Sequence, residues 1–332
     1  MSTARHIIAL LKSYVEGQEQ QFHSAALQIA AHEARLGHGK LAKEIKDLID
    51  QSKSNRTSID RKGSPVPLAQ PKGELAELLA ASYPKTKLSD MVLSPEVESR
   101  LKRILLEQKQ KNRLSEYNLS ARRKILLVGP PGTGKTMTAS ALAGELQLPL
   151  FSVIHSSLIG KFMGETASRL RLIFKAMLDT RGVYFFDEFD AIGTQRSSSN
   201  DVGEIRRVLN SFLLFIENDE SESLIIAATN HPNLLDEALF RRFDDVIEYG
   251  LPSEKLIRRF IKTRLSMFET HWDSWDTVTA AARGLSTAEI ARATEEAAKH
   301  TVLCHSQKIS QQDIISALRE RKEIASQRIN KL

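Results

Sequence analysis

The sequence has 332 residues, of which 41% are hydrophobic and 27% are charged, with a formal net charge of +6 and one cysteine. This length is sufficient for two or three domains with a sizeable core. The chain contains no run of about 18 apolar residues, so we expect no membrane span. One cysteine excludes an intrachain disulfide framework and favours a reducing cytoplasm. Basic and acidic residues are interleaved, so a nucleic-acid partner is permitted but not expected.

The first part of the chain is predicted to be a small helical region followed by a linker. Residues 1–52 carry apolar side chains at helical spacing, although they are too few for an independent core. We therefore expect this region to dock a partner or a substrate. Residues 53–73 are polar and rich in Ser, Pro and Gly, which predicts a linker.

Residues 74–252 are predicted to form an α/β domain. The segment "ELAELLAAS" at residues 74–82 reads as a helix, and "KILLVG", "VYFFDE" and "SLIIAATN" are apolar runs of strand length. Helical segments separate these runs, which predicts a parallel sheet with crossover helices. From Ser253 to residue 332 the pattern is helical, with segments at 254–268, 287–303 and 310–326.

The segment "GPPGTGKT", Gly129–Thr136, predicts a phosphate-binding loop. It follows a predicted strand and precedes the helical "MTASALAGEL", which is the context that the G-x-x-x-x-G-K-[ST] pattern requires. Its backbone N–H groups and the helix N-terminus favour phosphate, Lys135 would reach the β- and γ-phosphates, and Thr136 would ligate Mg²⁺. The residues expected to contact the nucleotide are Pro131, Gly132, Thr133, Gly134, Lys135, Thr136 and Met137.

Two acidic residues follow the strand "VYFF", at the carboxyl end where ligands bind in open α/β sheets. Asp187 is predicted to hold Mg²⁺ through water, and Glu188 to orient and polarise the attacking water. Adjacent acids can also form an ordinary strand end, but the phosphate-binding loop upstream favours the catalytic interpretation. Asn230 ends another predicted strand and is a candidate for positioning the same water.

The stretch "SLIGKFMGET" displays an aromatic residue on a loop. Phe162 and Met163 follow Lys161 between Gly160 and Gly164, and glycines leave the backbone free to turn. We interpret Phe162 as a displayed side chain, and a buried loop aromatic is the competing interpretation.

Four motifs, "GPPGTGKT", "FFDEFDAIG", "IIAATN" and "LLDEALFRRFDD", occur in this order. Together they resemble the classical clade of AAA+ ATPases, over about residues 88–321. The resemblance implies a P-loop NTPase module with a C-terminal helical lid over residues 253–332. It also implies ATP as the nucleotide, an ATP-promoted hexameric ring, and hydrolysis at subunit interfaces.

The resemblance also implies roles for residues outside the loop. Arg241 and Arg242 correspond to arginines that reach the neighbouring subunit's γ-phosphate, although many relatives place Pro-Gly between them and this chain does not. Met91 and Val92 correspond to a segment that clasps adenine. Lys161, Phe162 and Met163 correspond to the first pore loop, where Phe162 would grip an extended polypeptide.

The segment "GLSTAEI" is similar to the lid motif "G-F-S-G-A-D-I" of this family. Ala288 then stands where some AAA+ branches have a second sensor arginine. Arg292, one helical turn later, is the alternative for that role.

These residues predict an ATP-driven motor that remodels, unfolds or threads a protein. A DNA-acting AAA+ helper is the first alternative, and a nucleotide-switched regulator of a partner enzyme is the second. The sequence lacks "HExxH", so we expect any proteolysis to come from a separate chain. Short bacterial AAA ATPases that resemble this one are sometimes encoded beside a subtilisin-like serine protease, which makes such a protease a candidate partner.

Overall fold

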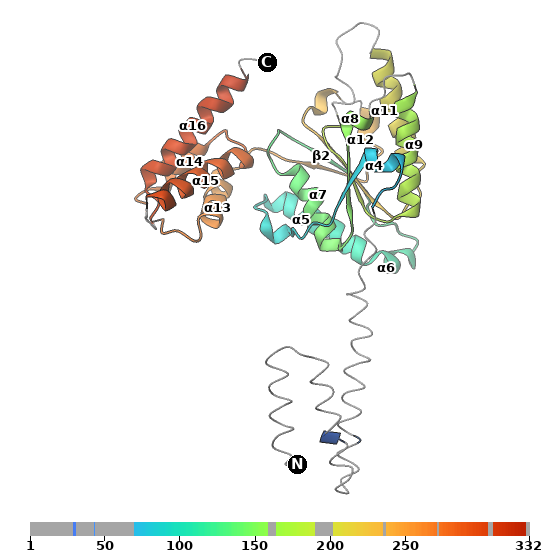
Figure 1. Ribbon diagram of the computed structural model, residues 1–332, viewed down its shortest axis with the longest axis horizontal. Helices are drawn as coiled ribbons and strands as arrows, with labels where there is room; N and C mark the ends of the chain where they lie inside the picture. Colours follow the sequence, from blue (N-terminus) through green and yellow to red (C-terminus); the bar gives the residue numbers. More distant parts are fainter. Residues whose placement is uncertain are drawn as a thin grey trace. The chain divides into compact units, whose positions relative to one another are not determined.

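The computed structural model describes residues 70–158, 164–189, 202–234, 237–270, 272–304 and 308–329, together with residues 29, 30 and 43 (Figure 1). The chain divides into two compact units, Met1–Leu68 and Ala69–Leu332, and the strands and helices below belong to the second. Nearly all of the predicted helical region and linker lies outside the described residues. Those two segments and the predicted domain boundaries stay predictions.

A six-stranded sheet forms the centre of the second unit, with the spatial order β1-β3-β4-β5-β2-β6. Neighbouring strands run parallel, except that β1 pairs antiparallel with β3 at one edge. The predicted α/β fold is confirmed, and β2, β4 and β5 fall in the three apolar runs. The strands are β1 (Leu79–Ser82), β2 (Lys124–Val128), β3 (Leu150–Val153), β4 (Val183–Phe186), β5 (Leu224–Thr229) and β6 (Asp245–Glu248).

The two edge strands differ from the sequence prediction. The helix predicted over residues 74–82 is wrong in its second half, because α4 (Glu74–Leu78) ends where β1 begins. Leucine and alanine favour a helix locally, but pairing with β3 satisfies the backbone of this segment in the folded chain. Strand β6 was not predicted, since four residues with only two buried side chains give too short a pattern.

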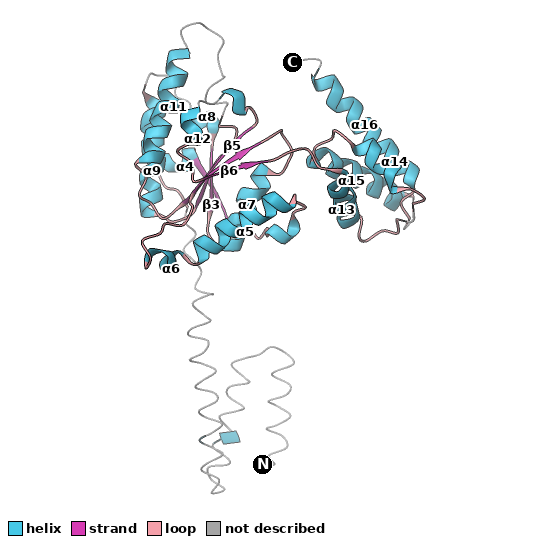
Figure 2. Cartoon of the chain, turned by 180° about the vertical axis from the view of Figure 1, so that it is seen from behind, coloured by secondary structure: helices cyan, strands magenta, loops and turns pink. Residues whose placement is uncertain are grey.

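Helices cover both faces of the sheet (Figure 2). Along β2, Ile125 and Leu127 pack in the core on the side of α5 and α7, whereas Leu126 and Val128 pack in the core on the side of α9 and α11. Because both faces are covered, the run is apolar without alternation. The principal helices are α5 (Pro95–Lys109), α7 (Lys135–Leu146), α9 (Glu165–Asp179) and α11 (Val202–Glu217), and the shorter ones are η2 (Leu88–Asp90), α6 (Lys111–Ser115), α8 (His155–Leu158), η3 (Pro232–Leu234) and α12 (Glu237–Phe240).

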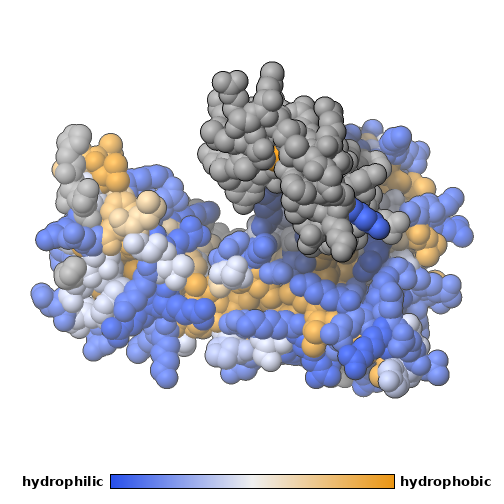
Figure 3. Space-filling model, turned by 90° about the horizontal axis from the view of Figure 1, so that it is seen from below, coloured by the Kyte–Doolittle hydropathy of each residue, from blue (hydrophilic) through white to orange (hydrophobic). Residues whose placement is uncertain are grey.

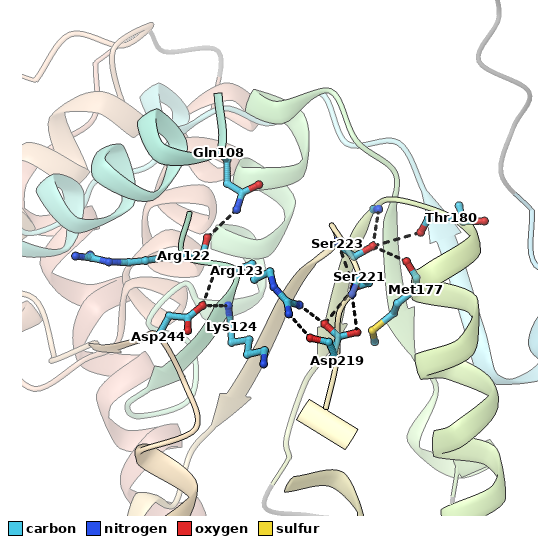
Figure 4. Close-up of polar contacts among 11 residues, drawn as sticks. Gln108, Arg122, Arg123, Lys124, Met177, Thr180, Asp219, Ser221, Ser223 and Asp244 are labelled. Carbon is cyan, nitrogen blue, oxygen red and sulfur yellow. Dashed lines mark hydrogen bonds and ion pairs between the residues drawn. The ribbon is translucent and has the colours of Figure 1, made fainter. Parts of the chain in front are cut away.

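Polar contacts stabilise the N-terminal end of the central strand β2 (Figure 4). The Arg123 guanidinium pairs with the buried carboxylate of Asp219, which follows α11. The Asp244 carboxylate accepts hydrogen bonds from the backbone N–H groups of Arg123 and Lys124, at 2.8 and 2.9 Å. Burial lowers the pKa of the Lys124 ammonium. These contacts hold the start of β2, whereas its other end leads into the phosphate-binding loop.

The last four long helices share a separate hydrophobic core, which includes Ile257, Val278, Ile290 and Ile314. The predicted helix at 287–303 matches α15, whereas the one predicted over 254–268 ends at Arg264. Beyond that point Met267 is 93% exposed, so its apolar side chain does not continue the buried stripe of the helix. The helices are α13 (Glu254–Arg264), α14 (Trp275–Ala282), α15 (Thr287–Leu303) and α16 (Gln311–Ile329), of which α14 was not predicted.

The face shown in Figure 3 is mainly hydrophilic, with apolar side chains gathered in a few places. Exposed apolar residues such as Tyr117 and Leu119 are normal on a globular surface. Among the described helices, none has the length and apolar character that a membrane crossing requires.

Candidate nucleotide-binding site

The loop between β2 and α7 begins with a close backbone contact. At Gly129, a Cβ atom would lie 2.1 Å from the carbonyl oxygen of Tyr249, the residue that follows β6. Only glycine admits this approach. The Tyr249 hydroxyl lies 2.6 Å from Thr138 Oγ1 on α7, and burial raises its pKa to about 12, so it stays protonated. Tyr249 therefore contacts both the start of the phosphate-binding loop and the first turn of α7.

Lys135, the first residue of α7, is almost fully buried and turned toward the loop. Its ammonium group donates to Gly129 O at 2.6 Å, Pro130 O at 2.9 Å and Asn230 Oδ1 at 2.8 Å. These oxygens stabilise a charge that burial alone would penalise. The contact also places Asn230, which follows β5, beside the loop, and its predicted role toward water stays a prediction.

Thr136 and Asp187 meet at the carboxyl ends of β2 and β4. Thr136 Oγ1 donates to Asp187 Oδ2 at 2.8 Å. A hydroxyl and a carboxylate in contact are oxygen ligands of the kind that Mg²⁺ prefers. The two residues predicted to hold the metal are thus in contact, although they lie 51 positions apart in the sequence.

Glu188 has an unusual backbone conformation, with φ at +41° in the left-handed region. A non-glycine residue there costs about 1–3 kcal/mol and persists only when its surroundings impose it. Two contacts do so: the Glu188 N–H donates to Asp187 Oδ1 at 2.9 Å, and the next N–H, of Phe189, donates to Ala228 O at 2.9 Å. The Glu188 side chain is exposed toward the site, as a residue that handles water requires.

A cavity of about 490 Å³ joins these groups. Nine of the predicted residues line it: Pro131, Gly132, Gly134, Lys135, Thr136, Met137, Asp187, Glu188 and Asn230. Three others do not line it. Thr133 is buried, with its hydroxyl bonded to Pro130 O at 2.8 Å, and Met91 packs its side chain beside Gly134. Val92 is half-buried, and its predicted contact with the base stays a prediction.

The helical C-terminal part completes the cavity with residues that sequence reasoning mostly missed. Phe260 and Arg264 come from α13, and Thr287, Ala288, Ala291 and Arg292 come from the start of α15. Arg292 was weighed as an alternative sensor, and the structure places it on the cavity wall. Phe260 and Arg264 are four residues apart and share one helix face, but this spacing by itself does not indicate that the face lines a cavity.

The arginine pair predicted to act on a neighbour lies elsewhere. Arg241 and Arg242 follow α12, Arg241 is exposed, and Arg242 Nε donates to Glu217 Oε2 at 3.0 Å. Neither belongs to the described residues that line the cavity. The predicted pore-loop residues Lys161, Phe162 and Met163 lie outside the described residues.

The residues present fit a nucleoside triphosphate with a divalent cation. A buried ammonium, a loop opening a 12-residue helix and an oxygen pair surround one cavity, and that helix N-terminus favours anions. Bound Mg²⁺ would neutralise phosphate charge beside Thr136 and Asp187. The fold and this site define a P-loop nucleotide-binding protein.

Comparison with known proteins identifies the family. The model for the ATPase family associated with various cellular activities (AAA) matches residues 125–251. An uncharacterized AAA family ATPase of Sinorhizobium fredii is 33% identical over 312 residues, which covers 94% of this chain and 93% of that protein. The chain therefore belongs to the AAA family of ATPases, and it is an enzyme that binds and hydrolyses ATP.

Other relatives share only part of their length with this chain. A putative 26S proteasome regulatory subunit homolog of Methanothermobacter marburgensis is 34% identical over 206 residues, covering 60% of this chain and 55% of that protein. The ATP-dependent zinc metalloprotease FtsH 4 of Sphaerobacter thermophilus is 39% identical over 184 residues, covering 53% and 28%. The crystal structure of the FIGL-1 AAA domain has a TM-score of 0.60 at 21% identity, covering 81% of this chain and 98% of that one, and shares the fold.

Proposed function

We propose that this ATPase is a motor that remodels, unfolds or threads a protein through a ring of about six subunits. Mg²⁺ is the cation that accompanies ATP, held by Thr136 and Asp187. Glu188 and Asn230 position and activate the attacking water. The protein partner includes, as one candidate, a separately encoded serine protease.

The observation that best supports the proposed ring of subunits is the position of Arg241 and Arg242. Arg241 is exposed and lies outside its own cavity, yet its fixed charge and planar fork suit a phosphate. An arginine in this position is available to the nucleotide of a second subunit, and we infer that it acts there. An arginine supplied in trans raises phosphoryl-transfer rates by roughly 10³ to 10⁵.

Two relatives support a protein substrate. One is named as a putative proteasome regulatory subunit homolog and the other as an ATP-dependent metalloprotease, so both names associate those proteins with proteolysis. The shared part here is the ATPase module, which covers just over half of this chain in each comparison. We therefore assign the module to driving work on a protein.

Removing the arginine pair tests the shared site. Subunits with Arg241→Ala and Arg242→Ala should bind ATP normally and hydrolyse it at least about 100-fold more slowly, because the missing charge belongs to the neighbour's site. Mixing them with Lys135→Ala subunits should restore part of the activity at hybrid interfaces. Turnover and sedimentation of the mixture measure this, and full activity in a monomeric preparation would refute the trans role.

Phe162→Ala tests the action on protein. Basal ATP hydrolysis should stay within about twofold of the parent rate, because Phe162 belongs neither to the phosphate-binding loop nor to the acidic pair Asp187 and Glu188. Action on the protein partner should fall about tenfold or more, since the aromatic contact area is lost, and Phe162→Trp should retain part of it. If Phe162 belongs to a core, the alanine variant would lose about 3–5 kcal/mol of stability instead. An alanine variant that melts early and loses hydrolysis would remove this support for threading.

A further inference from the structure

The N-terminus of α15 meets the phosphate-binding loop at a single carbonyl group. Thr287 Oγ1 donates to Gly132 O at 2.7 Å, and the backbone N–H of Ala288 donates to the same oxygen at 2.9 Å. A carbonyl oxygen has two lone pairs, so α15 alone supplies two donors to this one. The two subdomains are therefore hydrogen-bonded through Gly132.

The hydroxyl of Thr287 is not needed to begin α15. The helix has its own N-cap, because Ser286 Oγ accepts a hydrogen bond from Glu289 N at 3.3 Å. In the similar lid motif a glycine stands at the position of Thr287, and glycine has no side-chain donor. The bond to Gly132 is thus a separate contact, which this sequence adds.

This contact determines how one peptide unit of the loop is turned. Gly132 has φ at +75°, a conformation that glycine adopts easily and leaves easily. In a planar trans peptide the C=O and N–H groups point in opposite directions. Because Gly132 O is held by α15, the N–H of Thr133 is directed away from α15. Thr133 is itself held, since its hydroxyl donates to Pro130 O.

Crowding at the same point shows how closely α15 approaches. A Cβ atom on Gly132 would lie 2.7 Å from Ser286 Oγ and 3.0 Å from Ala288 Cβ. The contact is therefore packed as well as hydrogen-bonded. Rotation of this peptide would break both hydrogen bonds to α15.

We propose that Thr287 is a positioning residue for phosphate binding, which fixes the Gly132–Thr133 peptide so that the loop keeps its N–H groups turned toward the phosphates. Loop N–H groups are the donors that cradle phosphate in such sites. Thr287 acts through Gly132 and through no reacting atom. The inference depends on ATP binding and not on the remodelling role, so nucleotide alone tests it.

The test compares Thr287→Val, which keeps the shape and removes the donor, with Thr287→Ser, which keeps the donor. Competition with a fluorescent ADP analogue gives the Kd for ADP. The valine variant should bind ADP about 3- to 10-fold more weakly, the range for one hydrogen bond, and the serine variant within twofold of the parent. Thr263→Val is the matched control, because the Thr263 hydroxyl bonds only within its own helix in the described contacts, to Arg259 O.

Steady-state hydrolysis supplies a second readout. The KM for ATP should rise with the ADP Kd in the valine variant, while kcat stays within about twofold because Glu188 and Asp187 are unchanged. An unchanged Kd for ADP in the valine variant, with or without earlier thermal unfolding, would overturn the proposal. A serine variant that binds ADP as weakly as the valine variant would also overturn it. If the valine variant fails to fold, Thr287→Ala replaces it in the same comparison with serine.

Discussion

Glu188→Gln is expected to lower ATP hydrolysis at least about 100-fold while ATP affinity stays within about twofold. General-base catalysis contributes roughly 10² to 10⁴ in rate, and glutamine keeps the shape of the side chain while losing its basicity. The left-handed backbone at residue 188 should be retained, since the contacts that impose it come from Asp187 Oδ1 and Ala228 O. Turnover and nucleotide retention on the purified variant measure the two effects separately.

Asp187→Asn is the matched comparison for Glu188→Gln. Asp187 contacts the Thr136 hydroxyl, so its replacement should weaken Mg²⁺-dependent nucleotide binding as well as turnover. Nucleotide binding measured with and without Mg²⁺ would then distinguish the role of Asp187 from the role of Glu188. Near-normal hydrolysis by the Glu188 variant would remove the assignment of that residue as the base.

Lys135→Ala should weaken ATP binding at least about 100-fold. A hydrogen bond to a charged group contributes about 1.5–3 kcal/mol. The Lys135 ammonium is both charged and a hydrogen-bond donor, and its side chain is almost fully buried. Its loss also leaves Gly129 O and Pro130 O without this donor, which disturbs the loop itself. Isothermal titration with ATP and Mg²⁺ measures the change.

The control for Lys135→Ala is Lys102→Ala on α5. Lys102 is 66% exposed and pairs with Glu98 one helical turn away, an interaction worth under about 1 kcal/mol. Its replacement should leave ATP affinity unchanged. Equal losses in the two variants would mean that overall charge, and not the loop ammonium, governs binding.

Long apolar runs made the central strands predictable. In β2, β4 and β5 nearly every residue is buried, so the sequence itself carries a continuous hydrophobic signal. The edge strands lack this signal: β1, for example, forms the second half of a helix-favouring segment and is a strand because it pairs with β3. Local preference therefore fails where pairing with a distant strand decides the conformation.

The site shows the same division between local and distant signals. The phosphate-binding loop and the two acids were predictable because each lies at the end of a buried strand within one short motif. Phe260 and Arg264 were not predicted, since they reach the cavity only through the packing of α13 beside α15. The Thr287 contact joins residues 155 positions apart, and neither the sequence around Gly132 nor the sequence around Thr287 indicates it.

The close approach at Gly129 has a mechanical consequence. Tyr249 contacts the first residue of the loop, and α13 begins five residues later, while the start of α15 contacts the same loop at Gly132. Gly129 and Gly132, three residues apart in the loop, thus contact the chain that leads into the helical subdomain and the first turn of α15. A change in the conformation of the loop would therefore be felt by the helical subdomain through both the chain that leads into α13 and the start of α15.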